Sequence, residues 1–485
     1  MNNKKKIYLA LTLLIVLCLG SYLAFAKEDK IMIDKPNENY YIAAFIDGVA
    51  STTFPTSKDY TANVTCEKDG VAVDIGANVL WNGSKWKLSV DDASLSKVAC
   101  NIRFETKPTW SSPGEGTLLA AIKNNNTVTT STTTPGAEIS SSTEALLAST
   151  EDDYGTSYYF RGAVTNNYVE YANMCWRIVR ITGDGSIKLV LYNYNGLTST
   201  NNTPSSSTPC NVTGDTYAYA RYEGDTYTSA FNSRVTDNAY VGLMYGTAGA
   251  SSYAEAHANT NLSTILTNLN KWYTNVLSKQ ANFSDNQLAD TIWCNDKSVV
   301  TETAFNPNSL SLGTNYGYAK NASYYSATKR LVQASSFSAG GTGPSLICPN
   351  DNNGGKLSKF TVSDTTYGNG ALSGYAKVGL LTADEIAFAG GALKSSNLKY
   401  YIRGNANDFW WVLSPYAFTG SFARVWDAHN DSSLNFYRDD MWDILYNDTS
   451  LGDGYHGVRP SLSLQSGVKI SSGVGSATNP YKIVA

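Results

Sequence analysis

Charged side chains are scarce in this chain, and basic ones do not cluster beyond its N-terminus. Only 16% of the 485 residues are Asp, Glu, Lys or Arg, and the formal net charge is −4. Apart from Lys4, Lys5 and Lys6, no run of basic residues is present, so the chain lacks a positive field that would attract a polyanion. We therefore expect no nucleic-acid partner.

Metal-binding and hydrolase motifs are also missing. Histidine occurs only at His257, His429 and His456, and no two cysteines form a Cys-x-x-Cys pair, so a zinc site of standard spacing is not supported. Neither a Gly-x-Ser-x-Gly nor a His-Glu-x-x-His sequence occurs, which removes the usual signatures of serine hydrolases and zinc proteases. No Leu-Pro-x-Thr-Gly sorting signal precedes the C-terminus. Any attachment to a cell should therefore come through the N-terminal segment.

The N-terminus has the pattern of an export segment. The three lysines precede a predominantly apolar run over residues 7–25, which closes on Ala24, Phe25 and Ala26. A basic end, an apolar core and a small-x-small site make up a secretory signal peptide, although a run of roughly 20 residues can also span a bilayer. We expect residues 1–26 to be a signal peptide cleaved after Ala26, the alternative being a transmembrane anchor. The remainder should be extracellular, either secreted or held at the cell surface, with membrane contact through this segment only.

Even numbers of cysteines in exported chains favour disulfides. Six cysteines follow Cys18, which itself lies inside the apolar run. Sequence alone leaves several pairings open, and proximity along the chain suggests one set: Cys66 with Cys100, Cys175 with Cys210, and Cys294 with Cys348.

Residues 31–106 show the pattern of short strands and tight turns. Asp-Gly and Asn-Gly dipeptides lie beside apolar runs, as in hairpins. Four residues at every second position fall on one face of a strand: Val98, Cys100, Ile102 and Phe104. We expect a small β-sandwich, immunoglobulin-like in architecture, held together by a Cys66–Cys100 disulfide.

Residues 107–149 are rich in Ser, Thr, Asn, Pro and Gly and are broken mainly by an apolar piece at 118–122. Such a composition buries too little apolar surface to offset the entropy of ordering. We expect a flexible linker.

The third part, residues 153–485, should combine strands and helices. Apolar segments at 176–181 and 187–192 flank a Gly-Asp-Gly-Ser turn and indicate a hairpin. Apolar residues at spacings of three and four over 262–277 indicate a helix with one buried face. The expected fold class is α+β, with an N-terminal sandwich followed by a larger mixed domain.

Thr382 and Glu385 indicate the start of a shorter helix, because each side chain can accept a backbone N–H in the first turn. Asp384 and Glu385 are also candidates for a catalytic pair, as are Asp439 and Asp440. Glycoside hydrolysis needs two carboxyl groups that face each other across the substrate, whereas adjacent residues on one element point apart. Capping therefore explains the first pair at least as well as catalysis does.

Several blocks of this sequence resemble uncharacterised exported surface proteins of Gram-positive gut bacteria. The blocks nearest the C-terminus resemble modules of the formylglycine-generating-enzyme and C-type-lectin fold, which implies a C-type-lectin-like binding domain over 153–485. The resemblance depends on these blocks, in order: YYFRG at 158–162, CWRIVRI at 175–181, GDGS at 183–186, WCNDK at 293–297, GLLTADE at 379–385, WWVLSP at 410–415, GVRPSLSL at 457–464 and NPY at 479–481.

The sequence departs from the enzymes and the sugar-binding members of this fold. Formylglycine generation relies on a reactive cysteine pair near the C-terminus, and here the last cysteine is Cys348. The Glu-Pro-Asn and Gln-Pro-Asp motifs of calcium-dependent lectins are also missing. The resemblance thus implies a binding protein and not an enzyme.

A recognition surface is indicated between Tyr416 and Tyr455, where aromatic, Asp and Asn residues accumulate. Aromatic rings give large contact areas at low entropic cost, and Asn, Asp and Arg add directional hydrogen bonds. We expect the following residues to bind the ligand: Phe422, Trp426, Asp427, His429, Asp431, Asn435, Tyr437, Asp440, Trp442, Tyr446, Asn447 and Tyr455.

Two other interpretations apply to the same stretch. Trp426, Phe436 and Trp442 can instead fill the core while the polar residues line solvated loops. Seven aspartates occur between Asp427 and Asp453 and offer oxygen ligands for Ca²⁺, but no Asp-x-Asp-x-Asp-Gly loop is present. We expect no resident cofactor, with Ca²⁺ as the one metal worth testing.

These observations predict a non-enzymatic, surface-displayed ligand-binding or adhesion protein. Its partner should be a host or bacterial surface protein or a glycan. The composition of 427–455 also fits the variable face of proteins diversified by retroelements, which mutagenise adenines and enrich Asn, Asp and Tyr. The alternatives are a cell-wall or glycan hydrolase and a structural envelope protein.

Overall fold

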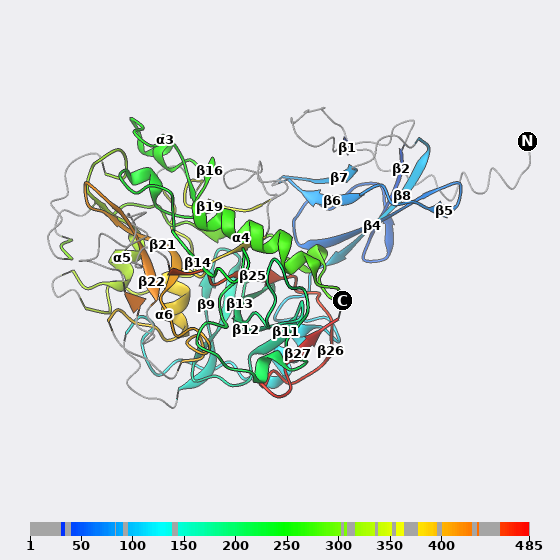
Figure 1. Cartoon of the computed structure of the whole chain (residues 1–485). Coiled ribbons are helices and arrows are strands. Elements are labelled where there is room, and N and C mark those ends of the chain that lie inside the picture. Colours follow the sequence, from blue (N-terminus) through cyan, green and yellow to red (C-terminus); the bar gives the residue numbers. More distant parts are fainter. Residues whose placement is uncertain are drawn as a thin grey trace, which may run out of the picture. The chain divides into compact units, whose positions relative to one another are not determined.

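A computed structural model of the chain describes much of residues 31–484 (Figure 1). The predicted signal or anchor segment, 1–26, lies outside the described residues. Within the described part, no helix has both the length and the apolar character needed to cross a membrane. The described ranges are 31–33, 40–82, 84–90, 96–137, 144–301, 305–307, 316–334, 338–351, 356–362, 377–394, 400–428, 434–435 and 456–484.

Strands predominate over short helices, so the predicted α+β class is confirmed. The chain divides into two compact units, with the boundary between Lys107 and Pro108. Each unit has its own hydrophobic core, as expected for a chain too long for a single ordinary core.

Two sheets enclose the core of the first unit. The three-stranded sheet has the order β1 (Ile31–Ile33), β7 (Trp86–Val90), β6 (Asn78–Trp81). The five-stranded sheet has the order β3 (Val49–Ser51), β2 (Tyr40–Ile46), β8 (Val98–Thr106), β4 (Tyr60–Lys68), β5 (Val71–Ala72). The predicted alternation along β8 is confirmed, because Val98, Cys100, Ile102 and Phe104 are all buried. Phe104 meets Trp86 of the other sheet at 5.5 Å between ring centroids.

The disulfide of the first unit does not join its two sheets. Cys66 of β4 and Cys100 of β8 are directly paired neighbours in one antiparallel ladder. The bond therefore crosses two adjacent strands, which differs from the inter-sheet disulfide of antibody domains. The contact between the sheets depends on apolar packing such as that of Trp86 on Phe104.

The flexible linker predicted for 107–149 is wrong for most of its length. Residues 108–137 and 144–149 belong to the second unit. The apolar piece forms helix α2 (Leu118–Asn125), begun by Thr117, whose hydroxyl accepts the N–H of Ala120. Leu118, Leu119 and Ile122 are fully buried in the main core. Tertiary burial of this one helical face outweighs the polar composition around it.

A nine-stranded sheet is the centre of the second unit. Its main path is β20 (Val378–Gly379), β25 (Ser461–Leu464), β13 (Ile187–Asn193), β12 (Met174–Ile181), β11 (Tyr168–Tyr171), β27 (Tyr481–Ile483), β26 (Ile470–Ser472). Strand β10 (Gly155–Gly162) pairs with β12 and with β9 (Ala145–Asp152). The predicted hairpin is β12–β13, and both strands are buried along their whole length.

A six-stranded sheet contains the strands on either side of the stretch that is predicted to bind a ligand. Its main path is β14 (Thr228–Ser229), β24 (His456–Gly457), β21 (Trp410–Phe418), β22 (Ala423–Ala428), β23 (Leu434–Asn435), and β18 (Ser323–Tyr324) pairs with β21. Two small sheets pair β15 (Met244–Tyr245) with β16 (Asn261–Leu262), and β17 (Trp293–Cys294) with β19 (Lys359–Phe360).

The helices of the second unit cover parts of these sheets. They are α3 (Tyr253–His257), α4 (Thr264–Asn275), α5 (Ser326–Leu331) and α6 (Ala383–Ala389). Helix α4 is the helix predicted over 262–277, and its Ile265, Leu266, Leu269 and Trp272 are buried. The predicted capping box is present in α6, where Thr382 and Glu385 each accept the other's backbone N–H.

All three predicted disulfides form. Besides Cys66–Cys100, they are Cys175–Cys210 and Cys294–Cys348 in the second unit. Disulfides are typical of proteins that leave the reducing cytosol.

Candidate functional site

The stretch predicted to bind a ligand joins β22, β23 and β24 of the six-stranded sheet. Phe422, Trp426 and Asp427 have described side chains, whereas Asn435 is described only in its backbone. The other predicted ligand-binding residues lie outside the described residues: His429, Asp431, Tyr437, Asp440, Trp442, Tyr446, Asn447 and Tyr455.

Strands β22 and β24, which precede and follow residues 429–455 in the sequence, both pair with β21 at Trp410. Strand β22 ends at Ala428, which is the register partner of Trp410 on one side of β21. Strand β24 begins at His456, and the next residue, Gly457, is the partner of Trp410 on the other side. Ala428 and Gly457 therefore flank Trp410 on its two sides, and we call this part of the sheet the Trp410 end.

Trp426 is a core residue, so the prediction that it contacts a ligand is wrong. Its side chain is 0% exposed and packs edge-to-face on Tyr416, with ring centroids 5.7 Å apart. Strand β22 is buried on both faces, which a half-exposed alternating strand would not be. Phe422 is partly exposed and packs beside the small core formed with Phe418 and Ala423.

His456 is the member of the Trp410 end that the sequence did not single out. Its ring lies 4.2 Å from that of Trp411 and stacks on Phe409 at 5.5 Å. Its Nε2 is 3.7 Å from Oδ2 of Asp427. Asp427 and His456 are 2% and 7% exposed, so they support the strand ends from within and offer a ligand little surface.

Partly exposed aromatic residues lie beside this cluster. β14 pairs with β24, which brings Tyr227, the residue before β14, next to β24. The Tyr227 ring stacks on Tyr219 at 5.5 Å, and its hydroxyl donates to Oδ2 of Asp408 over 3.0 Å. Burial, with help from the Asp408 bond, raises the pKa of Tyr227, so its hydroxyl stays a donor at neutral pH.

Arg221 organises the same surface. Its guanidinium lies 4.4 Å from the Tyr194 ring centroid and 4.3 Å from that of Tyr227. A buried cation between two partly exposed rings fixes their orientation. Sequence reasoning missed this group, because its members are spread over 194–227 and 408–409 and only the fold brings them together. The arrangement presents rigid aromatic faces with carboxylate and amide neighbours, which is suited to recognition.

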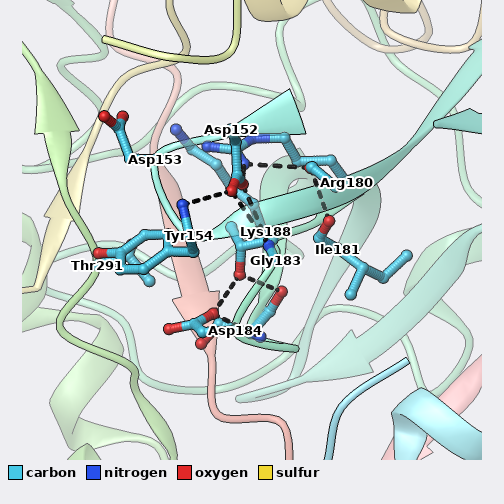
Figure 2. Close-up of polar contacts among 12 residues, drawn as sticks. Asp152, Asp153, Tyr154, Arg180, Ile181, Gly183, Asp184, Lys188 and Thr291 are labelled. Carbon is cyan, nitrogen blue, oxygen red and sulfur yellow. Dashed lines mark hydrogen bonds and ion pairs between the residues drawn. The ribbon is translucent and has the colours of Figure 1, made fainter. Parts of the chain in front are cut away.

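The carboxylate Glu385 takes part in a buried ionic network. It accepts bonds from Arg180 Nε over 2.9 Å and from Lys188 Nζ over 2.7 Å. Arg180 also donates to Asp152 over 2.6 Å, and Asp152 accepts the backbone N–H of Tyr154 (Figure 2). These contacts connect β9, β12 and β13 to α6.

A second ionic group surrounds Arg330 of α5. It donates to both oxygens of Asp384 over 2.7 Å and also binds Asp296. Both groups line one cavity of about 20 Å³, which has room for about one water molecule.

The charges in this cavity do not suit acid–base catalysis. Burial acts to raise the pKa of Glu385, but Lys188 and Arg180 outweigh it and hold the pKa at about 2. A general acid at neutral pH needs a pKa close to that pH. Glu385 is thus an ionised structural anion, and Asp384 forms an ion pair with Arg330. The second candidate pair, Asp439 and Asp440, lies outside the described residues.

One open polar hollow of about 390 Å³ lies elsewhere on the second unit. It is lined by neutral groups such as Asn173, Asn195 and Ser206, with Glu170 at its border. The Asn195 amide donates to the carbonyls of Asn173 and Ser206, so its donors are used to hold the loop.

Within the described ranges, no cluster of three or more His, Cys, Asp or Glu side chains is arranged to hold a metal ion. Most of the aspartates considered for Ca²⁺ lie in 429–433 and 436–455, outside those ranges.

Comparisons with protein-family models, with curated proteins and with solved structures found no match to this chain.

Proposed function

We propose that this chain is a non-enzymatic extracellular protein that binds a ligand at the Trp410 end of its six-stranded sheet. The observation that carries the proposal is the pairing of Trp410 with Ala428 on one side and with Gly457 on the other. The residues between these two positions in the sequence, 429–455, are rich in aromatic, Asp and Asn residues. Recognition loops on a rigid scaffold are a common way to build a binding site.

The aromatic group next to this stretch extends the proposed surface. Tyr194, Tyr227 and Phe409 are partly exposed, and Asn407 is exposed. Arg221 lies over the Tyr194 and Tyr227 rings. Phe409 stacks on His456, and Asn407 donates to Asp215. A surface protein or a glycan fits such a face, because both offer apolar faces together with polar groups.

We also propose where the protein acts and which proteins it is related to. Three disulfides suit an extracellular protein, delivered by the N-terminal segment and either released or anchored by it. We place the second unit with the C-type-lectin-like and formylglycine-generating-enzyme-like modules of exported Gram-positive surface proteins, on the sequence blocks quoted above.

The binding proposal is tested with the secreted form of the chain, from Lys27 onward. It should bind intact bacterial or host cells, or individual glycans on an array, without changing them. Tyr437→Ala and Tyr446→Ala should each weaken binding about tenfold or more, as expected for aromatic anchors. The matched control is Tyr41→Ala, because Tyr41 is 46% exposed and lies in the first unit. Equal binding by all four proteins, or turnover of the ligand, would contradict the proposal.

Diversification of the face is a separate part of the proposal. The codons for residues 426–455 should have an adenine-rich near-copy beside a reverse-transcriptase gene. Sequencing the neighbouring DNA decides this point, and a genome without such a copy would leave a binding surface of fixed sequence.

A further inference from the structure

Lys297 and Asn259 form a buried pair that the binding proposal does not use. Lys297 follows β17 and Asn259 follows α3, and their side chains meet in the interior of the second unit. The Lys297 Nζ donates to Oδ1 of Asn259 over 2.9 Å and to the carbonyl of His257, also over 2.9 Å. Lys297 is 0% exposed and Asn259 is 2% exposed.

The amine of Lys297 lacks the partner that a buried cation normally needs. Among the described residues, no carboxylate lies within ion-pair distance of its Nζ. Burial lowers the pKa of Lys297 well below its ordinary value, and the charge of Asp351 opposes this only in part. A desolvated lysine in its neutral form is a nucleophile.

The amide of Asn259 is held in place by hydrogen bonds on both its oxygen and its nitrogen. Its Oδ1 accepts a second hydrogen bond from Nδ2 of Asn295, over 3.2 Å. Asn295 is itself fixed, because its Oδ1 accepts the N–H of Leu243 and its Nδ2 donates to Met244. The Asn295 donor polarises the carbonyl and stabilises the oxyanion that forms on Oδ1 when Lys297 adds.

The amide nitrogen of Asn259 is also held in a fixed orientation. The Asn259 Nδ2 donates to the carbonyls of Lys356 and Lys359, each over 3.2 Å. The amide plane therefore cannot rotate freely away from Lys297. Fixed contact between two reacting groups replaces an encounter in solution and supplies a large part of the rate.

We propose that Lys297 and Asn259 join spontaneously in an intramolecular isopeptide bond. The Nζ of Lys297 adds to Cγ of Asn259, and Asn295 stabilises the oxyanion on Oδ1. The bond between Nζ and Cγ forms, the bond between Cγ and Nδ2 breaks, and one proton moves from Nζ to Nδ2. The products are one secondary amide and one molecule of ammonia, and no oxidant or reductant is required.

The crosslink would close the chain between residues 259 and 297, next to the Cys294–Cys348 disulfide. Unlike a disulfide, an amide is not broken by thiols. Such a bond would preserve this part of the second unit under reducing conditions, and it restricts the unfolded chain as any crosslink does.

Mass spectrometry of the purified wild-type chain tests this proposal. After reduction of the disulfides, its intact mass should be lower than the sequence mass by one ammonia, once the mapped N-terminus is taken into account. Trypsin should fail to cleave after Lys297 and should release one branched peptide that contains both Lys297 and Asn259. A full sequence mass with normal cleavage after Lys297 would overturn the proposal.

Variants distinguish the ammonia lost in forming this bond from ammonia lost by other reactions. Lys297→Met should restore the full mass. Asn259→Asp keeps the shape of the side chain, and by losing water in place of ammonia it should reach the same final mass as the crosslinked wild type. Lys359→Arg is the matched control, since Lys359 is also buried but pairs with Asp153 at 2.7 Å. It should still lose one ammonia, and persistence of that loss in Lys297→Met would contradict the proposal.

Discussion

Glu385 of α6 accepts a hydrogen bond from Arg180 of β12 over 2.9 Å, with both side chains buried. The same carboxylate binds Lys188 of β13. Glu385→Gln should destabilise the second unit by about 3–5 kcal/mol, because it leaves two buried cations short of their anion. Urea unfolding of the variant and the wild type measures the difference.

A surface ion pair provides the control for this change. Glu223 and Lys271 lie 3.7 Å apart with side chains 72% and 48% exposed. Glu223→Gln should change the free energy of unfolding by no more than about 0.5 kcal/mol. If Glu385→Gln and Glu223→Gln lowered the free energy of unfolding equally, the buried ionic network would contribute no more to stability than a surface ion pair.

The depressed pKa of Glu385 also predicts a pH dependence. In the folded chain its pKa is about 2, against an ordinary value of 4.5. Its stabilising effect is therefore fully present above about pH 4.5 and is lost as the pH falls toward 2. Asp152 acts in the opposite sense, because burial raises its pKa. The contribution of Glu385 is best isolated as the difference between wild type and Glu385→Gln, which should shrink over this acid range. A constant difference would contradict the assignment.

Features that depend on neighbours in the sequence were predictable. The disulfide pairs, the β12–β13 hairpin and the capping box of Thr382 and Glu385 each follow from residues close together in the chain. The spacing of apolar residues identified α4 for the same reason.

Features that depend on distant contacts were not predictable. The ionic partners of Glu385 are Arg180 and Lys188, far away in the sequence, and only the fold brings them together. Helix α2 is ordered by the core it meets, although its surroundings have the composition of a linker. For the proposed binding site, composition indicated the stretch, but it could not separate buried Trp426 from a surface residue or find the Tyr227 group.

The two units should unfold separately, and the Cys66–Cys100 bond should affect only the first. The bond closes a loop of 34 residues, so its loss should cost about 3–4 kcal/mol. In calorimetry, the double variant Cys66→Ser, Cys100→Ser should lower the midpoint temperature of one unfolding transition and leave that of the other unchanged. Cys294→Ser with Cys348→Ser should have the reverse effect. Equal shifts of both transitions would show that the units unfold as one.

Substitution of Trp426 should reduce stability, whereas substitution of Tyr227 should reduce ligand binding. Trp426→Ala should cost about 3–5 kcal/mol of stability, because it removes a fully buried ring packed on Tyr416. Tyr227→Ala should leave folding nearly intact, since the ring is partly exposed, and should weaken ligand binding about tenfold. Tyr227→Phe keeps the ring against Arg221 but loses the hydrogen bond to Asp408. The affinity of this variant for the ligand should therefore lie between those of the wild type and Tyr227→Ala. Thermal unfolding and binding to the same cells or glycans, measured side by side, check each outcome. If Tyr227→Ala bound as well as wild type at unchanged stability, the aromatic group beside the Trp410 end would lie outside the ligand contact.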